Sequence, residues 1–295
     1  MAEVQAERAG TPIVVGVDGS LPSLRAAAWA GLEARLQGQR LHLLTSCALP
    51  PRSGTSVPAE AEIEWLRADG EWVLDEAVRA ARATAGGSVP ITTELTFELI
   101  TPTLLDRSVR AAMLAVGRRG RGGVAPTVIG SLSSAVTAHA QCPVAVVSGQ
   151  SGTDPVSRNK PVAAGVDGSP HSLVALETAF AEASRRGVGL VAVHAWSDTS
   201  GIALPTDRRP TDEALLGRWM AGPARRYPQV KVERVVRTDA PARTLTAESA
   251  WAQLLVVGRR GRGGAPGTVL GATTVALLYA AECPLMVVHG RPMRD

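Results

Sequence analysis

The stretch Val116-Gly-Arg-Arg-Gly-Arg-Gly-Gly123 occurs twice in this chain, the second time at positions 257–264. A shorter segment, Gly16-Val-Asp-Gly-Ser20, also recurs without change, at positions 165–169. The two segments keep the same order in both halves of the chain. The sequence is therefore an internal duplication. The distance between the two segments is shorter in the second copy, which predicts a shorter loop there, corresponding to residues around 50–58.

The end of each copy repeats as well, because Cys142-Pro143 and Cys283-Pro284 each precede an apolar run. A chain of 295 residues exceeds the usual size of one domain, and about 150 residues per domain is the ordinary expectation. Residues 149–161 are rich in Gly, Ser and Pro and predict a linker. The predicted organisation is a disordered tail at 1–11, a first domain at 12–148, the linker, and a second domain at 162–290.

The composition, with 45% apolar and 20% charged residues, is that of an ordinary globular protein. No apolar run is long enough to span a membrane, and the N-terminus lacks a secretory signal pattern, so we expect a cytoplasmic protein without membrane contact. The three cysteines are far apart, which argues against a disulfide framework and predicts buried packing for Cys142 and Cys283.

Strand and helix patterns alternate through both copies, which predicts an α/β fold with a parallel sheet and helices on both faces. In the first copy the patterns predict strands at 12–17, 41–46, 91–99, 111–116 and 144–147, and helices from Ser20 to Gly38 and at 60–85, 103–110 and 131–140. The second copy repeats this order, with helices beginning near Pro170, Asp212 and Thr273.

Asp18 follows the first predicted strand, and the glycine-rich segment at Gly117 follows the fourth. Ligands of open parallel sheets bind beyond the carboxyl ends of the strands, where the chain order reverses. Glycines let backbone N–H groups approach a phosphate, and the following helix start adds partial positive charge. Ser131 and Ser133 can donate to the same oxygens, while Asp18 can accept from a ribose hydroxyl or hold Mg²⁺. No Gly-Lys-[Ser/Thr] segment occurs, and no Gly-x-Gly-x-x-Gly follows the first strand, so two common phosphate motifs are excluded.

Other chemical signals in the sequence are weak. The histidines are scattered without metal-ligand spacing, so we expect no structural metal site. No Gly-x-Ser-x-Gly segment or cluster of paired carboxylates predicts catalytic residues. The loop arginines are not interleaved with aromatic residues, so we do not expect nucleic-acid binding. Trp29, Trp65 and Trp72 fall at apolar helical positions and predict packing in a core or an interface.

These motifs together resemble the universal stress protein family, in particular the tandem two-domain members of its ATP-binding branch. That branch carries Gly-x2-Gly-x9-Gly-[Ser/Thr], and Gly117, Gly120, Gly130 and Ser131 match this spacing. Gly258, Gly261 and Gly271 also match, but Ala272 replaces the expected Ser or Thr. This departure predicts a weaker second site, although Thr273 and Thr274 lie nearby and Thr274 corresponds to Ser133.

The resemblance implies a set of nucleotide-binding residues in each copy. In the first copy these are Gly16, Val17, Asp18, Ser46, Val116, Gly117, Arg119, Gly120, Gly130, Ser131 and Ser133. In the second copy they are Gly165, Val166, Asp167, Ala195, Val257, Gly258, Arg260, Gly261, Gly271, Thr273 and Thr274. The resemblance further implies strand order 3-2-1-4-5 in five-stranded sheets, and pairing of the two domains through their fifth strands, with a homodimer as a further possibility.

The function that this resemblance implies is ATP binding, together with Mg²⁺, by a stress-response regulator whose nucleotide biases a partner or an oligomer. Two alternatives stay open at this point. One is a slow ATP hydrolase, although no general base can be named. The other is an interaction scaffold that binds no nucleotide.

Overall fold

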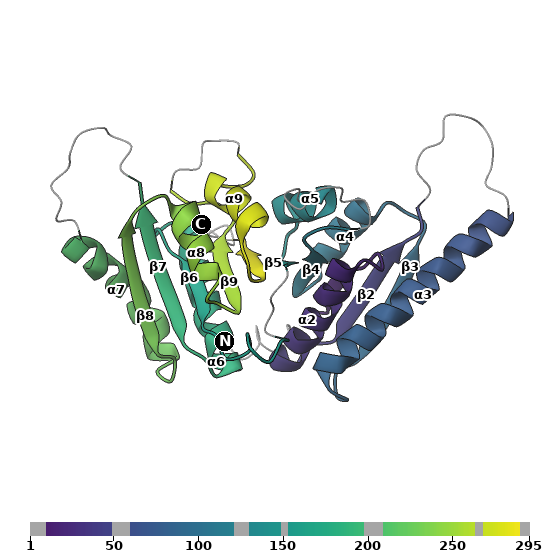
Figure 1. Cartoon of the computed structure of the whole chain (residues 1–295), viewed down its shortest axis with the longest axis horizontal. Helices are drawn as coiled ribbons and strands as arrows, with labels where there is room; N and C mark the ends of the chain where they lie inside the picture. The colour runs from purple at the N-terminus through teal and green to yellow at the C-terminus, as the bar shows by residue number, and fades with distance from the viewer. Residues whose placement is uncertain are drawn as a thin grey trace. The chain divides into compact units, whose positions relative to one another are not determined.

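The computed structural model describes residues 10–48, 60–120, 130–148, 153–197, 209–262 and 268–289. The chain divides into two compact units, Met1–Val147 and Ser148–Asp295, which are called the first and second domains below (Figure 1). None of the helices in the described residues is long and apolar enough to cross a membrane.

Each domain alternates strands and helices. The first contains β1 (Ile13–Gly16), α2 (Leu21–Gln37), β2 (Leu41–Ser46), α3 (Glu60–Ala85), β3 (Ile91–Thr96), α4 (Ile100–Ser108), β4 (Met113–Gly117), α5 (Ser131–His139) and β5 (Val144–Val147). The second contains β6 (Val162–Gly165), α6 (Pro170–Arg186), β7 (Leu190–Trp196), α7 (Arg209–Arg226), β8 (Val232–Thr238), α8 (Pro241–Ser249), β9 (Leu254–Gly258), α9 (Ala272–Ala280) and β10 (Leu285–Val288).

The strands of the first domain are all parallel, in the order β3-β2-β1-β4-β5, which confirms the predicted 3-2-1-4-5 arrangement. The strands of the second domain follow the corresponding order, β8-β7-β6-β9-β10. Helices α2 and α3 cover one face of the first sheet and α4 and α5 the other; α6 with α7, and α8 with α9, do the same in the second domain (Figure 1). Successive strands are therefore added on one side of β1 and then, from β4, on its other side; the same reversal of strand order occurs between β6 and β9.

The first helix of each domain begins and ends as its sequence predicts. The hydroxyl oxygens of Ser20 and Ser169 accept hydrogen bonds from the backbone N–H groups of Ser23 and Ser172, and a proline occupies the first turn of each helix. Gly38 and Gly187 end the helices with φ of 64° and 65°, in the left-handed region that favours glycine.

The two domains differ in how their second helix packs. A Cβ on Gly31 of α2 would collide with the Ala81 carbonyl oxygen, so glycine permits the close approach of α3. Phe180 occupies the corresponding position of α6, is fully buried, and stacks on Tyr227 with ring centroids 6.3 Å apart. An aromatic pair thus fills in the second domain the space that the close helix contact occupies in the first.

The tryptophans divide between core and surface. Trp29 is fully buried, which confirms the core prediction for this residue, but Trp65 and Trp72 are 67% and 51% exposed. Core packing is therefore wrong for these two, and packing in an interface stays a prediction. Helix α3 buries a stripe of mostly small residues against α2 and turns the two indoles away. Helical spacing alone cannot tell which of two apolar stripes on the same helix packs against the rest of the domain.

Residues 153–160, part of the predicted linker, form hydrogen-bonded turns that pack on the second domain. The Asp154 carboxylate accepts from the Val156 N–H and the Ser157 hydroxyl. The Gln253 amide donates to the Arg158 and Lys160 carbonyl oxygens over 2.8 Å and 2.6 Å. Hydrogen bonds from the Gln253 side chain therefore fix the position of residues 153–160, although their composition predicts only a linker.

All three thiols are buried, as predicted for Cys142 and Cys283. Burial raises the pKa of Cys142 to about 12 and also raises that of Cys47. Since the thiolate is the reactive species, neither thiol is activated at neutral pH.

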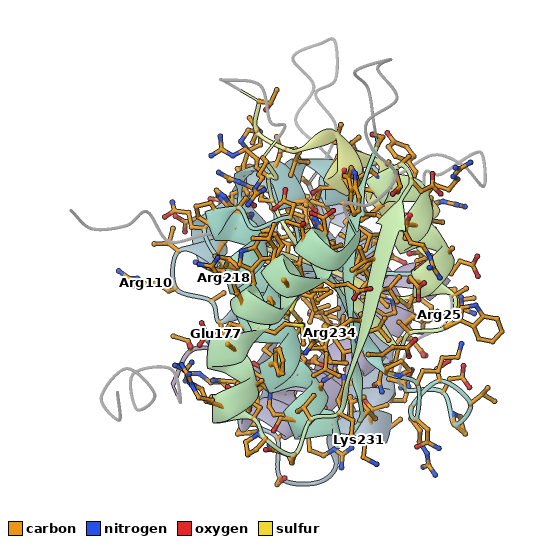
Figure 2. All side chains as sticks on the ribbon, turned by 90° about the vertical axis from the view of Figure 1, so that its left-hand side faces the viewer. Arg25, Arg110, Glu177, Arg218, Lys231 and Arg234 are labelled. Atoms are coloured by element: carbon orange, nitrogen blue, oxygen red, sulfur yellow. The ribbon has the colours of Figure 1, made fainter. Side chains whose placement is uncertain are left out.

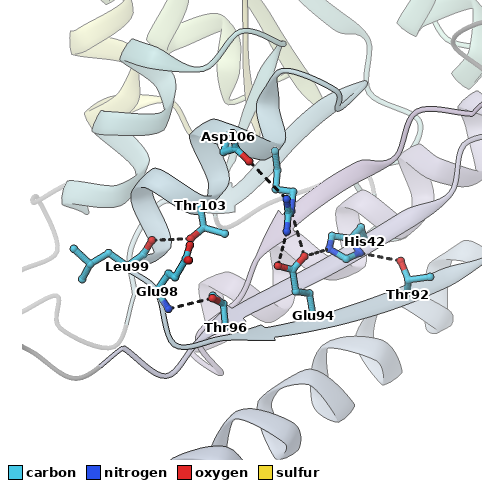
Figure 3. A network of polar contacts seen from close by, with 9 residues as sticks. His42, Thr92, Glu94, Thr96, Glu98, Leu99, Thr103 and Asp106 are labelled. Atoms are coloured by element: carbon cyan, nitrogen blue, oxygen red, sulfur yellow. Dashed lines mark hydrogen bonds and ion pairs between the residues drawn. The ribbon is translucent and has the colours of Figure 1, made fainter.

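A polar network covers part of the first sheet (Figure 3). The Glu94 carboxylate on β3 accepts from the Arg107 guanidinium of α4 over 2.7 Å, and its second oxygen lies 2.8 Å from Nε2 of His42 on β2. His42 Nδ1 lies 2.9 Å from the Thr92 hydroxyl. The Arg107 hydrogen bond outweighs desolvation and holds the pKa of Glu94 below its ordinary value.

Candidate functional site

The carboxyl ends of β1 and β4 lie side by side in the first domain, and those of β6 and β9 in the second. In the register of these parallel strands Gly16 pairs with Val116, and Ala164 pairs with Val256. Asp18 and Asp167 therefore emerge beside the glycine-rich segments that begin at Gly117 and Gly258, as the repeat predicts.

A tight turn follows the first strand of each domain and orients its aspartate. The Asp18 carboxylate accepts from the Ser20 N–H at 3.0 Å and from the Ser20 hydroxyl at 2.5 Å. Asp167 accepts from the Ser169 N–H at 2.9 Å. Gly19 and Gly168, with φ of 75° and 78°, supply the left-handed backbone that the turns require.

The glycine-rich segment lies directly across each aspartate. A Cβ on Gly120 would collide with Oδ2 of Asp18, and a Cβ on Gly261 would collide with Oδ2 of Asp167. In the second domain the Arg262 N–H also donates to Oδ2 of Asp167 over 2.7 Å. The aspartate thus anchors the segment, a role that the sequence motif does not predict.

Asp167 is ionised at neutral pH. Burial by itself would raise the pKa of this carboxyl, but hydrogen bonds from Ser169, the Arg262 N–H and Ser172 outweigh it and lower the pKa below its ordinary value. The site therefore carries a fixed negative charge beside the backbone of the glycine-rich segment.

A helix begins at the end of the segment in both domains. Gly130 and Gly271 are the N-cap residues of α5 and α9, and neither helix has a side-chain cap. The N-terminal N–H groups of these helices are therefore suited to an anion. Ser131 and Ala272 are exposed at the first helical position, and Thr273 follows Ala272 half-buried.

The hydroxyl groups of Ser133 and Thr274 form hydrogen bonds within their own domains. Both side chains are buried, and their hydroxyls donate to the carbonyl oxygens of Gly117 and Gly258 over 2.8 Å and 3.0 Å. Each hydroxyl has a single proton, and here it fastens the helix to the end of the neighbouring strand. The same arrangement in both domains explains why the sequence has a hydroxyl residue at both positions.

In the second domain these residues surround a cavity of about 600 Å³. It is lined by every residue that the resemblance implies for the second copy: Gly165, Val166, Asp167, Ala195, Val257, Gly258, Arg260, Gly261, Gly271, Thr273 and Thr274. The structure thus brings together segments that are up to about a third of the chain apart.

The first-copy residues occupy the matching positions of the first domain. Val17 and Val116 are buried, and the Thr45 hydroxyl donates to the Val17 carbonyl oxygen over 2.8 Å. Ser46 ends β2 and donates to the Glu98 carbonyl oxygen over 2.6 Å. Gly16, Asp18, Gly117, Arg119, Gly120, Gly130, Ser131 and Ser133 lie at the ends of β1 and β4 and at the start of α5.

Arginine side chains border both sites. Within the described residues, the Nε atoms of Arg119 and Arg260 are buried without a hydrogen-bond partner. Arg260 donates through its terminal nitrogen to the Thr268 carbonyl oxygen at 3.3 Å. Burial lowers the pKa of the neighbouring Arg259, and Arg260 lowers it further. Burial, Arg260 and Arg259 also lower the pKa of His171, whose backbone contacts Gly258.

An aromatic group specific to the second domain was not predicted from the sequence. The His194 Nδ1 lies 2.7 Å from the Val166 carbonyl oxygen, and its ring stacks on Trp196 with centroids 5.4 Å apart. Trp219 of α7 meets the His194 ring edge-on at 5.3 Å, and the Arg262 guanidinium lies 5.3 Å from the Trp219 ring centroid. The sequence signal for this group is the difference between the two copies: His194-Ala-Trp196 stands where the first copy has Thr45-Ser-Cys47.

Asp212, in the first turn of α7, also lines the cavity, whereas the sequence pattern predicts only a helix start there. Its Oδ2 is buried and has no hydrogen-bond partner among the described residues. No group of three or more His, Cys, Asp or Glu side chains in the described residues is arranged to hold a metal ion.

The comparisons with known proteins agree with this architecture. The model of the Universal stress protein family matches residues 11–148 and 158–289. The chain is 40% identical over 284 residues to Universal stress protein Rv2005c of Mycobacterium tuberculosis, which covers 94% of this chain and 96% of that protein. It is 36% identical over 285 residues to Universal stress protein Rv2623 of the same organism, with 94% and 96% coverage.

A solved structure of a universal stress protein from Archaeoglobus fulgidus superposes with a TM-score of 0.71 at 18% identity, and covers 95% of this chain and 98% of that one. At this identity the likeness concerns the fold alone. The family match extends over both domains, and the two mycobacterial relatives span nearly the whole chain. This chain therefore belongs to the universal stress protein family, with two tandem family domains.

Proposed function

We propose that this chain binds ATP together with Mg²⁺ at the carboxyl ends of its strands, and that the bound nucleotide regulates a partner or an assembly during stress. The observation that carries the proposal is the second-domain cavity. A volume of about 600 Å³ lies within the range of small-ligand sites, roughly 300–1,000 Å³.

The lining residues fit the parts of a nucleotide. Gly258, Gly261 and the uncapped start of α9 offer backbone N–H groups to phosphates, and Arg260 adds positive charge. Asp167 is the carboxylate beside them that would accept from the ribose or hold Mg²⁺, which favours oxygen ligands and phosphates. The first domain supports a similar site through Asp18, Gly117 and the start of α5.

Nucleotide analysis of the purified chain tests the proposal. Heat-denatured protein should release ATP on chromatography, and calorimetric titration of stripped protein with Mg-ATP should give saturable binding. Release of ADP with matching phosphate production would favour the slow hydrolase instead. Protein that carries no nucleotide and shows no heat of ATP binding would contradict the proposal and favour the scaffold.

A further inference from the structure

The second-domain cavity has two chemically different ends. It extends across the carboxyl ends of three neighbouring strands, β9, β6 and β7, and Asp167, just after the central strand β6, lies between β9 and β7. The glycine-rich segment and the start of α9 form one end, beside β9. Trp196, Ser197 and Asp212 form the other, beside β7. Two strand spacings separate the ends, which is roughly 10 Å.

The end beside β7 combines an aromatic surface with an acceptor. Trp196 is half-buried, and the buried His194 ring that stacks against it limits its movement. The Asp212 carboxylate lines the same cavity, and Oδ2 has no hydrogen-bond partner among the described residues. A buried acceptor that is left unsatisfied costs about 1–3 kcal/mol, so this atom favours a ligand that donates an N–H.

The position of α7 over the cavity depends on contacts specific to the second domain. Trp219 packs directly over Gly168, where any Cβ would collide with its indole ring. The Arg262 guanidinium lies over the Trp219 ring, and the backbone N–H of Arg262 donates to the Asp167 carboxylate. Between Asp212 and Trp219, a Cβ on Gly217 of α7 would lie 3.6 Å from the guanidinium of Arg234 on β8. Arg234 is labelled in Figure 2. Asp212 is thereby held at a defined place relative to the glycine-rich segment.

We propose that Asp212 selects the nucleobase at the second site by accepting a hydrogen bond from the 6-amino group of adenine, while Trp196 contacts the face of the base. This inference rests on the proposed function, because it assumes that a nucleotide lies with its phosphates at the glycine-rich end. Inosine carries an oxygen in place of the amino group, so its lone pairs would face the carboxylate. The site therefore discriminates ATP from ITP.

The experiment uses the full chain and a signal from the second site alone. The indole N–H resonance of Trp196, identified by its loss in Trp196→Phe, is followed by NMR during titration with Mg-ATP, Mg-ITP and Mg-GTP. We expect ATP to bind about tenfold or more tighter than ITP, in line with one hydrogen bond to a charged group. In Asp212→Asn the ratio of the ATP affinity to the ITP affinity should fall toward one, because the asparagine amide can donate to the inosine oxygen.

Glu213→Gln is the matched control, since Glu213 is the neighbouring, exposed carboxylate of the same helix turn and should keep the wild-type ratio. Equal affinities for ATP and ITP in the wild type, or tighter binding of GTP, would overturn the role of Asp212 even if Asp212→Asn failed to fold. An unchanged ATP-to-ITP affinity ratio in folded Asp212→Asn would also overturn the role of Asp212, while the proposal that the chain binds ATP would stand. If no nucleotide shifts the Trp196 resonance while ATP binds the first domain, the second site itself is absent. If none binds anywhere, the proposed function fails as well.

Discussion

Gly120 and Gly261 lie against the carboxylates of Asp18 and Asp167 with no room for a side chain. At the scale of single residues, this contact explains the second glycine of the repeated motif better than chain flexibility does. The missing Cβ lets the segment cross the aspartate and, in the second domain, donate its anchoring hydrogen bond from the Arg262 N–H to the Asp167 carboxylate.

Gly261→Ala is therefore expected to displace the segment and weaken ATP binding at the second site by roughly tenfold or more, about 1.4 kcal/mol. Calorimetry measures the affinity, and circular dichroism checks the fold. Gly222→Ala is the control, because a Cβ there meets nothing within 4 Å and α7 should gain stability. Equal affinity in folded Gly261→Ala would separate the segment from the phosphates.

A second residue-scale prediction concerns Ser131 and Ala272, which hold equivalent first positions of α5 and α9. Ser131 offers a hydroxyl where Ala272 offers none, and Thr274 cannot compensate while its proton bonds to Gly258. A neutral hydrogen bond contributes about 0.5–1.5 kcal/mol, so the second site should be roughly two- to tenfold weaker. Ala272→Ser should strengthen the second site and Ser131→Ala should weaken the first. Two equal sites that neither substitution alters would refute this difference.

At the scale of elements, α6 contains a buried ion pair whose arginine is replaced by a glutamine at the corresponding position of α2. Glu182 and Arg186 have side chains only 1% and 4% exposed and lie 2.6 Å apart. Gln37 replaces the arginine in α2, where its amide donates to Glu33 over 3.0 Å. Removing one member of a buried pair leaves the other charge uncompensated.

Glu182→Ala is expected to lower the unfolding free energy of the second domain by about 3–5 kcal/mol. Chemical denaturation, followed by hydrogen exchange of the α6 amides, measures it. Arg243→Ala provides the comparison, since it breaks a surface pair with Asp239, whose side chains are 78% and 31% exposed, and should change stability little. Similar losses in both variants would mean that the buried pair has no special role.

The network of Glu94 ties β2, β3 and α4 together and makes this part of the first domain sensitive to acid (Figure 3). Because the folded-state pKa of Glu94 is lowered, its stabilisation is present above the unfolded pKa, about 4.3, and is lost as pH falls through the lower folded value. Hydrogen exchange of β3 should therefore accelerate as the pH falls below about 4.3, after correction for intrinsic rates. Glu94→Gln should reduce this dependence, whereas Glu71→Gln, on the exposed side of α3, should keep it. The same profile in all three proteins would exclude Glu94 as its cause.

At the scale of the whole molecule, each domain has a strand at the end of its order, β5 or β10, that pairs with only one neighbour within that domain. Both strands are short and apolar, and proteins normally cover or pair such edges. We predict that residues 144–147 and 285–288 pair, so that one chain is a pseudo-dimer.

Separately expressed halves, 1–148 and 153–295, should accordingly dimerise or aggregate, and sedimentation velocity measures their mass. Replacing one valine of β5 by lysine should reduce self-association of the first half. Two stable monomeric halves would contradict the pairing. The second half begins at residue 153 because the turns at 153–160 pack against the second domain.

Much of the architecture follows from the sequence alone. The repeated segments locate both candidate sites, and the Ser20 and Gly38 signals mark a helix correctly, because caps and left-handed glycines depend on local backbone geometry. The three spaced glycines Gly258, Gly261 and Gly271 line the second-domain cavity, since neighbouring parallel strands bring their ends to one edge. The other residues that the family resemblance implies for this copy line it as well.

Only the tertiary structure decided which side chains outside the repeated motifs line that cavity. Trp196 and Asp212 come from β7 and α7, and no periodicity relates them to the glycine-rich segment. Ser133 and Thr274 bond to strand carbonyl groups, and Trp65 lies exposed, because the partner of a side chain depends on which element packs against it. Local patterns determine elements and their ends, whereas contacts between distant segments determine what each site can recognise.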